Sequence, residues 1–130
     1  MKLVLRCWLG MVAPRIGRGI AMHKMVVLAK AADGRAEELA RWYDEQHIPD
    51  LLAVPGFVSG ERHAVFPVKA PEGTTQWDFM LIYEIAGDNP MTVLATMGGL
   101  MGTEKMPVSD ALESVHTLSV VGISKFRQDN

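Results

Sequence analysis

The segment from Trp77 to Ile85 constrains the fold of this 130-residue chain more than any other. Two interleaved sets of side chains run along it: Trp77, Phe79, Leu81, Tyr83 and Ile85 alternate with Asp78, Met80, Ile82 and Glu84. A period of two is typical of a β-strand, whose successive side chains point to opposite faces of a sheet. Because Met80 and Ile82 are apolar as well, this strand is expected to need cover on both faces.

Five further elements follow from the same kind of pattern. Residues 25–30 and 57–66 predict two strands, residues 34–47 and 91–97 predict two helices, and residues 115–125 predict a last strand rich in β-branched side chains. The order β-α-β-β-α-β predicts an α+β fold, a ferredoxin-like sandwich in which an antiparallel four-stranded sheet carries both helices on one face.

The first helix is expected to place a histidine toward the core. Its inward stripe consists of residues spaced by three and four: Ala36, Leu39, Ala40, Tyr43 and His47. Pro49 lacks a backbone donor, so the helix is expected to end near His47. The ordinary pKa of histidine is roughly 6.5. At the end of a helix the dipole favours the charged imidazole and raises this pKa, whereas burial lowers it. The alternative is a core histidine that only bonds a backbone carbonyl.

The sheet face opposite the helices is expected to be an interface. Both faces of the sheet are expected to be apolar, so the face without helices is apolar as well. The strand at 77–85 offers Met80 and Ile82 on one side and Phe79, Leu81 and Tyr83 on the other, and the last strand offers Leu118 and Val120 against Val121 and Ile123. A large exposed apolar patch usually marks an interaction site. Two-fold symmetry would bury the same patch on two copies, so the sequence predicts a homodimer that packs sheet against sheet. The alternative, that the N-terminal segment covers this face, fits less well because that segment carries arginines.

Composition narrows the class of protein. Hydrophobic residues are 48% and charged residues 22%, a balance typical of a globular domain. The net charge is -2 and no basic cluster is present, so the sequence lacks the basic surface typical of a nucleic-acid-binding protein. The single cysteine, Cys7, excludes an internal disulfide and the zinc sites built on paired cysteines. We therefore expect a cytoplasmic protein.

The N-terminal residues read differently from the rest. Residues 1–22 carry Lys2, Arg6, Arg15 and Arg18 and no acidic residue. The apolar stretch at residues 3–13 is too short to span a membrane and is interrupted by Arg6. We expect residues 1–22 to be a disordered or peripheral leader, and residues 23–127 to form the domain, with no membrane span.

Three segments carry a resemblance to a known family. They are the run Trp42-Tyr43-Asp44-Glu45-Gln46-His47-Ile48-Pro49, the turn Val54-Pro55-Gly56-Phe57, and the strand from Trp77 to Tyr83. Over residues 25–126 the chain resembles the EthD-like proteins of the dimeric α+β barrel superfamily. That superfamily includes muconolactone-isomerase-like enzymes, cofactor-independent monooxygenases, polyketide cyclases and haem-degrading oxygenases. The resemblance implies a dimeric α+β barrel with a ligand pocket between sheet and helices and His47 near its mouth.

The candidate catalytic residues lie on the first helix. His47 is expected to act as general base or acid toward an enolisable or phenolic carbon skeleton. Tyr43, one turn earlier, shares its face and could donate a hydrogen bond to a carbonyl or enolate oxygen. Asp44, three residues before His47, could orient the imidazole.

The candidate substrate-binding residues lie on the strands. Arg62 would suit a carboxylate or phenolate, and Trp77 and Tyr83 could line an aromatic pocket. Arg62 and His63 point to opposite faces of a strand, so only one of them reaches the pocket. The sequence leaves open which one. It also leaves open whether Arg62 is an exposed edge residue and the aromatics are simply core.

No cofactor is expected. The glycines at 87, 98, 99 and 102 do not form a dinucleotide-binding turn, and there is no persuasive second ligand set for haem. His116 could join His47 and His63 in a metal site, but scattered single histidines lack ligand spacing, so the metal-free interpretation is preferred.

Two hypotheses about function follow. The first is a small cofactor-independent lyase, isomerase, dehydratase or oxygenase that acts on an apolar, oxygenated small molecule. The second is a non-catalytic dimeric protein that binds a hydrophobic metabolite for a partner enzyme. Both would use an apolar pocket with a few polar groups. A dimer without any ligand, in which His47 only ties the helix to the next strand, is a third possibility.

Overall fold

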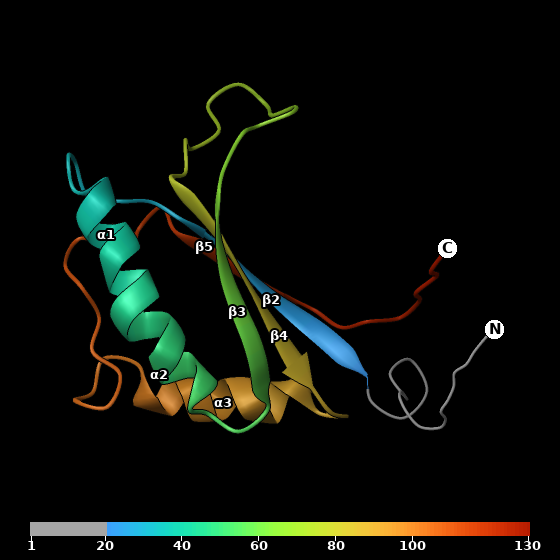
Figure 1. Ribbon diagram of the computed structural model, residues 1–130. Coiled ribbons are helices and arrows are strands. Elements are labelled where there is room, and N and C mark those ends of the chain that lie inside the picture. The colour runs from blue at the N-terminus through green and yellow to red at the C-terminus, as the bar shows by residue number, and fades with distance from the viewer. Residues whose placement is uncertain (1–20) are drawn as a thin grey trace.

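A computed structural model describes residues 21–130, so residues 1–20 of the expected leader, including Cys7, lie outside the described residues. The first described strand begins at Met22 (Figure 1). The elements are, in order, β2 (Met22–Ala29), α1 (Ala36–Trp42), the π-helix η2 (Tyr43–His47), α2 (Ile48–Leu52), β3 (Phe57–Ala64), β4 (Phe79–Ala86), α3 (Pro90–Leu100) and β5 (Leu118–Gly122). The predicted β-α-β-β-α-β order is confirmed.

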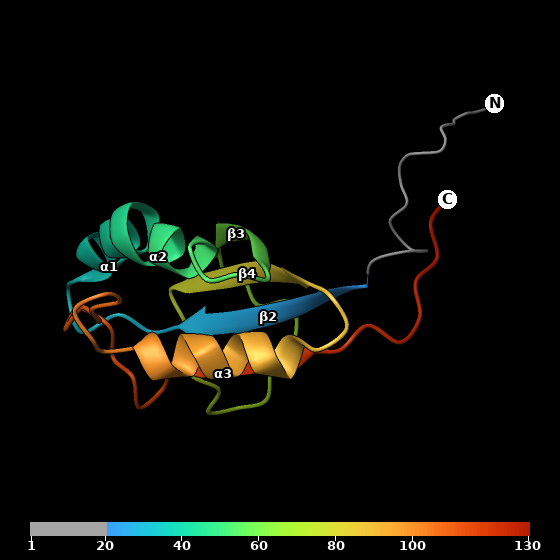
Figure 2. The ribbon, with the colours of Figure 1, turned by 90° about the horizontal axis from the view of Figure 1, so that it is seen from below.

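The four strands form one antiparallel sheet in the order β3-β4-β2-β5. The split order, with β4 between β3 and β2, is that of a ferredoxin-like fold. The helices lie on one side of the sheet in Figure 1, and Figure 2 shows α1 and α2 beside β3 and α3 beside β2. The predicted α+β class, an antiparallel four-stranded sheet with its helices on one face, is confirmed.

The core lies between the sheet and these helices. Alternate side chains of β2 and β4 point toward the helices and are buried, as the alternation predicted. They are His23, Met25, Val27 and Ala29 on β2 and Leu81, Tyr83 and Ile85 on β4. The helical layer contributes Leu39, Tyr43 and Leu51 to the same cluster. Phe57, at the start of β3, is buried against them and meets Tyr83 edge-on at 6.0 Å.

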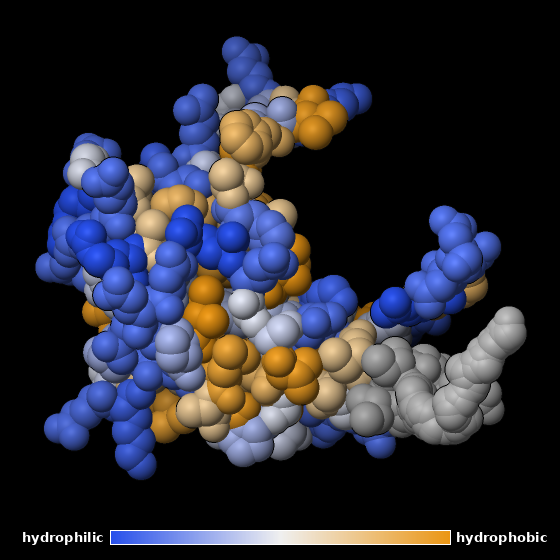
Figure 3. Space-filling model, in the orientation of Figure 1, coloured by the Kyte–Doolittle hydropathy of each residue, from blue (hydrophilic) through white to orange (hydrophobic). Residues whose placement is uncertain are grey.

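The opposite face of the sheet carries apolar side chains without helical cover. They come from three strands: Val26 and Leu28 on β2, Met80 and Ile82 on β4, and Leu118 and Val120 on β5. Leu118 and Val120 are 45% and 51% exposed. We call these six residues the bare face. Figure 3 shows a hollow on this side, between the loop after β3 and the C-terminal tail.

The first helix does not end where the sequence predicted. The Ile48 amide donates to the Tyr43 carbonyl five residues back, where a regular α-helix would use the carbonyl four back. This wider π turn moves the backbone away from the ring of Pro49, and the turn needs no donor from proline. The helix therefore continues as α2 to Leu52, and the predicted end near His47 is wrong.

Two other boundaries differ from the prediction. The helix α3 passes through Gly98 and Gly99 to Leu100, because the cost of about 1 kcal/mol per glycine is offset by the packing of Met97 and Leu100 on the core. The last strand is shorter than residues 115–125, because residues 115–116 form a turn and residues 123–130 leave the sheet. Among residues 21–130, no helix has the length and apolar character needed to cross a membrane.

Candidate functional site

His47 lies in the layer between helix and sheet and is only 6% exposed. Its ring stacks on that of Trp42, with 4.5 Å between centroids and 17° between planes, and meets Tyr43 edge-on at 5.7 Å. Five residues of a regular α-helix turn through about 500°, which would point positions 42 and 47 in different directions. The π turn therefore brings the indole and the imidazole together.

The buried polar atoms of this layer are not all paired. His47 Nδ1 and the Tyr83 hydroxyl have no hydrogen-bond partner within residues 21–130. Burial lowers the pKa of His47 to about 4, and the nearby Asp50 carboxylate opposes that shift. Burial raises the pKa of Tyr43, and raises that of Tyr83 with a further contribution from Tyr43. At neutral pH the imidazole is therefore uncharged and both phenols keep their protons.

The strand β3 turns Arg62 toward the helices. Its Nε and Nη2 donate to the two carboxylate oxygens of Asp44 at 2.8 and 2.7 Å, and its guanidinium lies 4.8 Å from the centre of the Phe79 ring. This pair lowers the pKa of Asp44 and raises that of Arg62. His63 has the opposite parity and faces the bare side of the sheet. Asp44 thus holds Arg62, and has no hydrogen bond to His47 among the described residues.

The two aromatic candidates on the strands are placed differently. Tyr83 is fully buried beside Gly60, and a Cβ added at Gly60 would lie 2.9 Å from the Tyr83 ring. The glycine therefore makes the space that the phenol occupies. Trp77 donates its indole N–H to the His116 carbonyl at 2.7 Å and takes no part in the contacts around His47. The structure brings His47, Tyr43 and Tyr83 into one layer and leaves Trp77 outside it.

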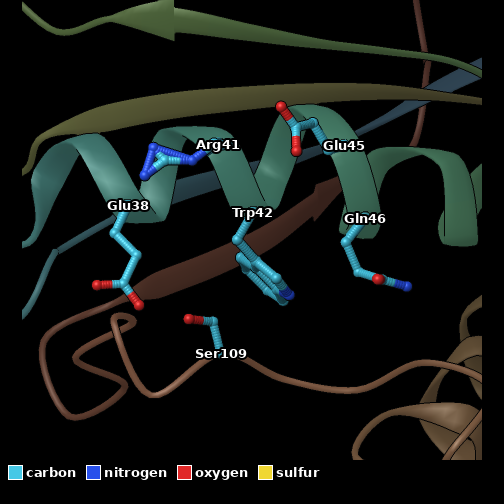
Figure 4. A pocket seen from close by; sticks show the side chains of 6 residues that line it. All are labelled: Glu38, Arg41, Trp42, Glu45, Gln46 and Ser109. Carbon is cyan, nitrogen blue, oxygen red and sulfur yellow. The ribbon is translucent and has the colours of Figure 1, made fainter.

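A surface groove of about 420 Å³ lies on the outer side of this helix (Figure 4). It is lined by Glu38, Arg41, Trp42, Glu45, Gln46 and Ser109. In Figure 4 Trp42 projects from the helix toward Ser109, which lies on the loop that follows α3. The groove does not touch His47, but it touches the residue that stacks on it.

Sequence reasoning missed one buried polar residue, His23. Its Nε2–H donates to the Gly87 carbonyl at 2.9 Å, and its Nδ1 accepts from the Ser124 amide at 3.0 Å. Alternation along the strand could have identified it, because His23 lies two residues before Met25 and therefore points to the same buried face as Met25 and Val27. Both ring nitrogens are thus satisfied, and His23 has a structural role that joins the end of β4 to the C-terminal tail.

The described residues hold no group of three histidine, cysteine, aspartate or glutamate side chains that could bind a metal ion. His47 is buried under the helix, His63 faces the bare side, and His116 pairs with Glu113 before β5. The alternative of a site built from these three histidines therefore has no geometric support within residues 21–130.

Comparison with known proteins gives distant likenesses only. No protein-family profile and no curated protein matches the chain. The crystal structure of an EthD family protein from Bacillus halodurans C-125 aligns over 80% of this chain and 99% of its own, with 13% identity and a TM-score of 0.47. A hypothetical protein from Pyrococcus horikoshii aligns over 79% of this chain and 92% of its own, with 18% identity and a TM-score of 0.35. Both TM-scores lie under 0.5, so these likenesses carry no argument about the function of this chain.

Proposed function

We propose that this chain is a small enzyme without a cofactor, acting on an apolar, oxygen-bearing small molecule as a lyase, isomerase, dehydratase or oxygenase. One observation carries the proposal. A buried, uncharged imidazole, that of His47, leaves Nδ1 without a partner in the same layer as the phenol of Tyr83, whose hydroxyl is also unpartnered within residues 21–130. Such groups cost free energy unless a ligand or water pairs them.

The chemistry assigned to these groups is proton transfer. His47 exchanges a proton with an acidic C–H or O–H of the ligand, and Tyr83 donates a hydrogen bond to the oxygen on which negative charge develops. Tyr43, edge-on to the imidazole, is the second donor. A developing oxyanion beside the imidazole stabilises its charged form, which offsets the burial that lowers the pKa of His47 to about 4.

The Arg62–Asp44 pair is assigned to ligand recognition. Asp44 fixes the guanidinium through two hydrogen bonds, and Phe79 supports its face. Arg62 is thereby pre-oriented for a carboxylate or phenolate of the ligand. The geometry favours Asp44 as the partner of Arg62 over its predicted role beside His47, and Trp77 as a binding residue stays a prediction.

The test compares two histidine variants. His47→Gln removes the proton-transfer group, while His116→Gln removes an exposed imidazole from the same protein. Both are assayed for turnover of enolisable carbonyl compounds and phenols, and for ligand-induced thermal shifts. We expect His47→Gln alone to lose turnover while still folding. Turnover by His47→Gln at the wild-type rate would refute the assignment.

One observation favours the second hypothesis, a non-catalytic binding protein. A pKa of about 4 makes His47 a weak base at neutral pH, although it remains a good hydrogen-bonding group. A binding protein would show thermal shifts with members of the panel and no turnover in the wild type. In that case His47→Gln and Tyr83→Phe would reduce the ligand-induced thermal shift, and there would be no turnover rate to reduce.

We also propose that the chain forms a homodimer through the bare face. Support comes from the six apolar side chains on three strands and from the hollow beside them in Figure 3. Val120→Glu, on this face, should give a monomer in sedimentation measurements because it would bury an unpaired charge. Val108→Glu is the matched control, since Val108 is 45% exposed but lies next to Ser109 on the loop beside α1, on the helical side of the sheet. A wild type that sediments as a monomer would overturn the proposal.

A further inference from the structure

The outer groove and the buried His47 are separated by one side chain. Trp42 lines the groove, and the same indole stacks on the imidazole. Because one face of the indole is occupied by His47 at 4.5 Å, the groove meets its other face or its edge. Displacing this ring would therefore join the groove to the imidazole.

The indole is held by packing alone: besides the stack on His47 it meets the Tyr43 ring at 4.7 Å and packs against the core. It is half-buried, and within residues 21–130 no hydrogen bond holds its N–H, whereas Trp77 donates to the His116 carbonyl. Its position depends on the π turn of η2, and such turns frequently occur at functional sites. The facing wall of the groove is the loop that carries Ser109, which belongs to no helix or strand.

We propose that the groove over Trp42 is the entrance to the His47 site, and that Trp42 is the side chain that opens and closes it. This inference rests on the proposed function, in which a ligand must reach His47. The indole offers a planar apolar surface, while Arg41, Gln46 and Glu45 provide donors and an acceptor around it. A planar, unsaturated ring that bears oxygen atoms is the class of ligand that fits these groups.

The alternative route lies on the other side of η2, past the Arg62–Asp44 pair. Those two side chains are tied by two hydrogen bonds across the helix and the strand. If ligands entered there, breaking the pair would expose His47 and removing the indole would not. The two routes therefore predict opposite responses for variants at positions 42 and 44.

The experiment measures access to His47 with diethyl pyrocarbonate, a small reagent that acylates uncharged imidazole. The full chain is labelled at neutral pH, and each histidine peptide is quantified by mass spectrometry, with the exposed His116 as internal reference. In Trp42→Ala we expect His47 to be labelled about tenfold faster relative to His116, the factor expected when a stacked aromatic pair is lost. Asp44→Asn should leave the rate at its wild-type value.

Two controls separate a gate from a general loss of stability. Phe126→Ala removes an exposed aromatic ring from the C-terminal tail and should not change the labelling of His47. If Trp42→Ala fails to fold, Ser109→Phe provides the reverse test, because it fills the groove from the loop side and should slow the labelling. Wild-type rates in Trp42→Ala or in Ser109→Phe, or faster labelling in Asp44→Asn, would overturn the entrance. Labelling does not depend on turnover. The test of the entrance at Trp42 is therefore independent of the test of the proposed function with His47→Gln, and either proposal can fail without the other.

Discussion

Replacing His47 by glutamine should remove the contribution of this imidazole to the pH dependence of the free energy of unfolding, which falls between pH 6.5 and about 4. The imidazole has an ordinary pKa of 6.5, and burial lowers it to about 4 in the folded chain. Between these two values the unfolded chain binds a proton that the folded chain does not. The free energy of unfolding therefore falls as the pH falls through this window. The contribution is complete above the unfolded pKa and is lost by the folded pKa.

The magnitude follows from the two pKa values. Each pH unit between 6.5 and about 4 corresponds to about 1.4 kcal/mol, so His47 accounts for about 3 kcal/mol. The figure is not reduced for solvent screening, because His47 is only 6% exposed. With a urea m value of about 1–3 kcal/mol/M, the unfolding midpoint should fall by about 1 M or more.

The assay is urea unfolding of the wild type and of His47→Gln at several pH values from about 7.5 to about 4. Glutamine does not titrate, so any packing that the variant loses lowers its free energy of unfolding by the same amount at every pH. Carboxylates whose pKa is lowered by partners, such as Asp44 and Glu84, are common to both proteins and cancel in the difference. A difference between the two proteins that stays constant with pH would show that the imidazole is not desolvated as described.

Three further substitutions test the packing around the site and the second helix. Gly60→Ala should cost about 1–3 kcal/mol in urea unfolding, because the new Cβ would lie 2.9 Å from the Tyr83 ring. Gly98→Ala, a matched change in α3 with nothing within 4 Å, should instead stabilise by about 1 kcal/mol. Asn89→Ala should cost about 1 kcal/mol, because the Asn89 side chain accepts from the Thr92 amide. Equal effects of the two glycine changes would contradict the close contact at Tyr83.

The strands could be predicted because their signal is local. The alternation from Trp77 to Ile85 has a period of two that no helix reproduces, and β4 follows it from Phe79 to Ala86. The bare face could be predicted for the same reason, since both parities of this strand are apolar. The ends of the last strand could not, because pairing with β2 decides them and the pairing stops at Leu118 and Gly122.

The site was harder to predict because it depends on a backbone irregularity. A stripe counted at α-helical spacing placed Tyr43 and His47 inward correctly, but it gave no reason to pair His47 with Trp42. Pro49 was interpreted as a stop, since sequence patterns do not distinguish a proline that ends a helix from one that follows a π turn. Asp44 was assigned to His47 by spacing, whereas its partner Arg62 is contributed by β3.

The unpartnered polar atoms need an explanation that the backbone does not supply. Pro49 accounts for the π turn, but phenylalanine at position 83 would fill the same space as Tyr83 without burying a hydroxyl. Each unpaired buried group costs about 1–3 kcal/mol, and a domain's total stability is only about 5–15 kcal/mol. The packing of Leu39, Leu81 and Ile85 does not require either His47 Nδ1 or the Tyr83 hydroxyl. Under the proposed function, a ligand that enters this layer offsets that cost by pairing both atoms.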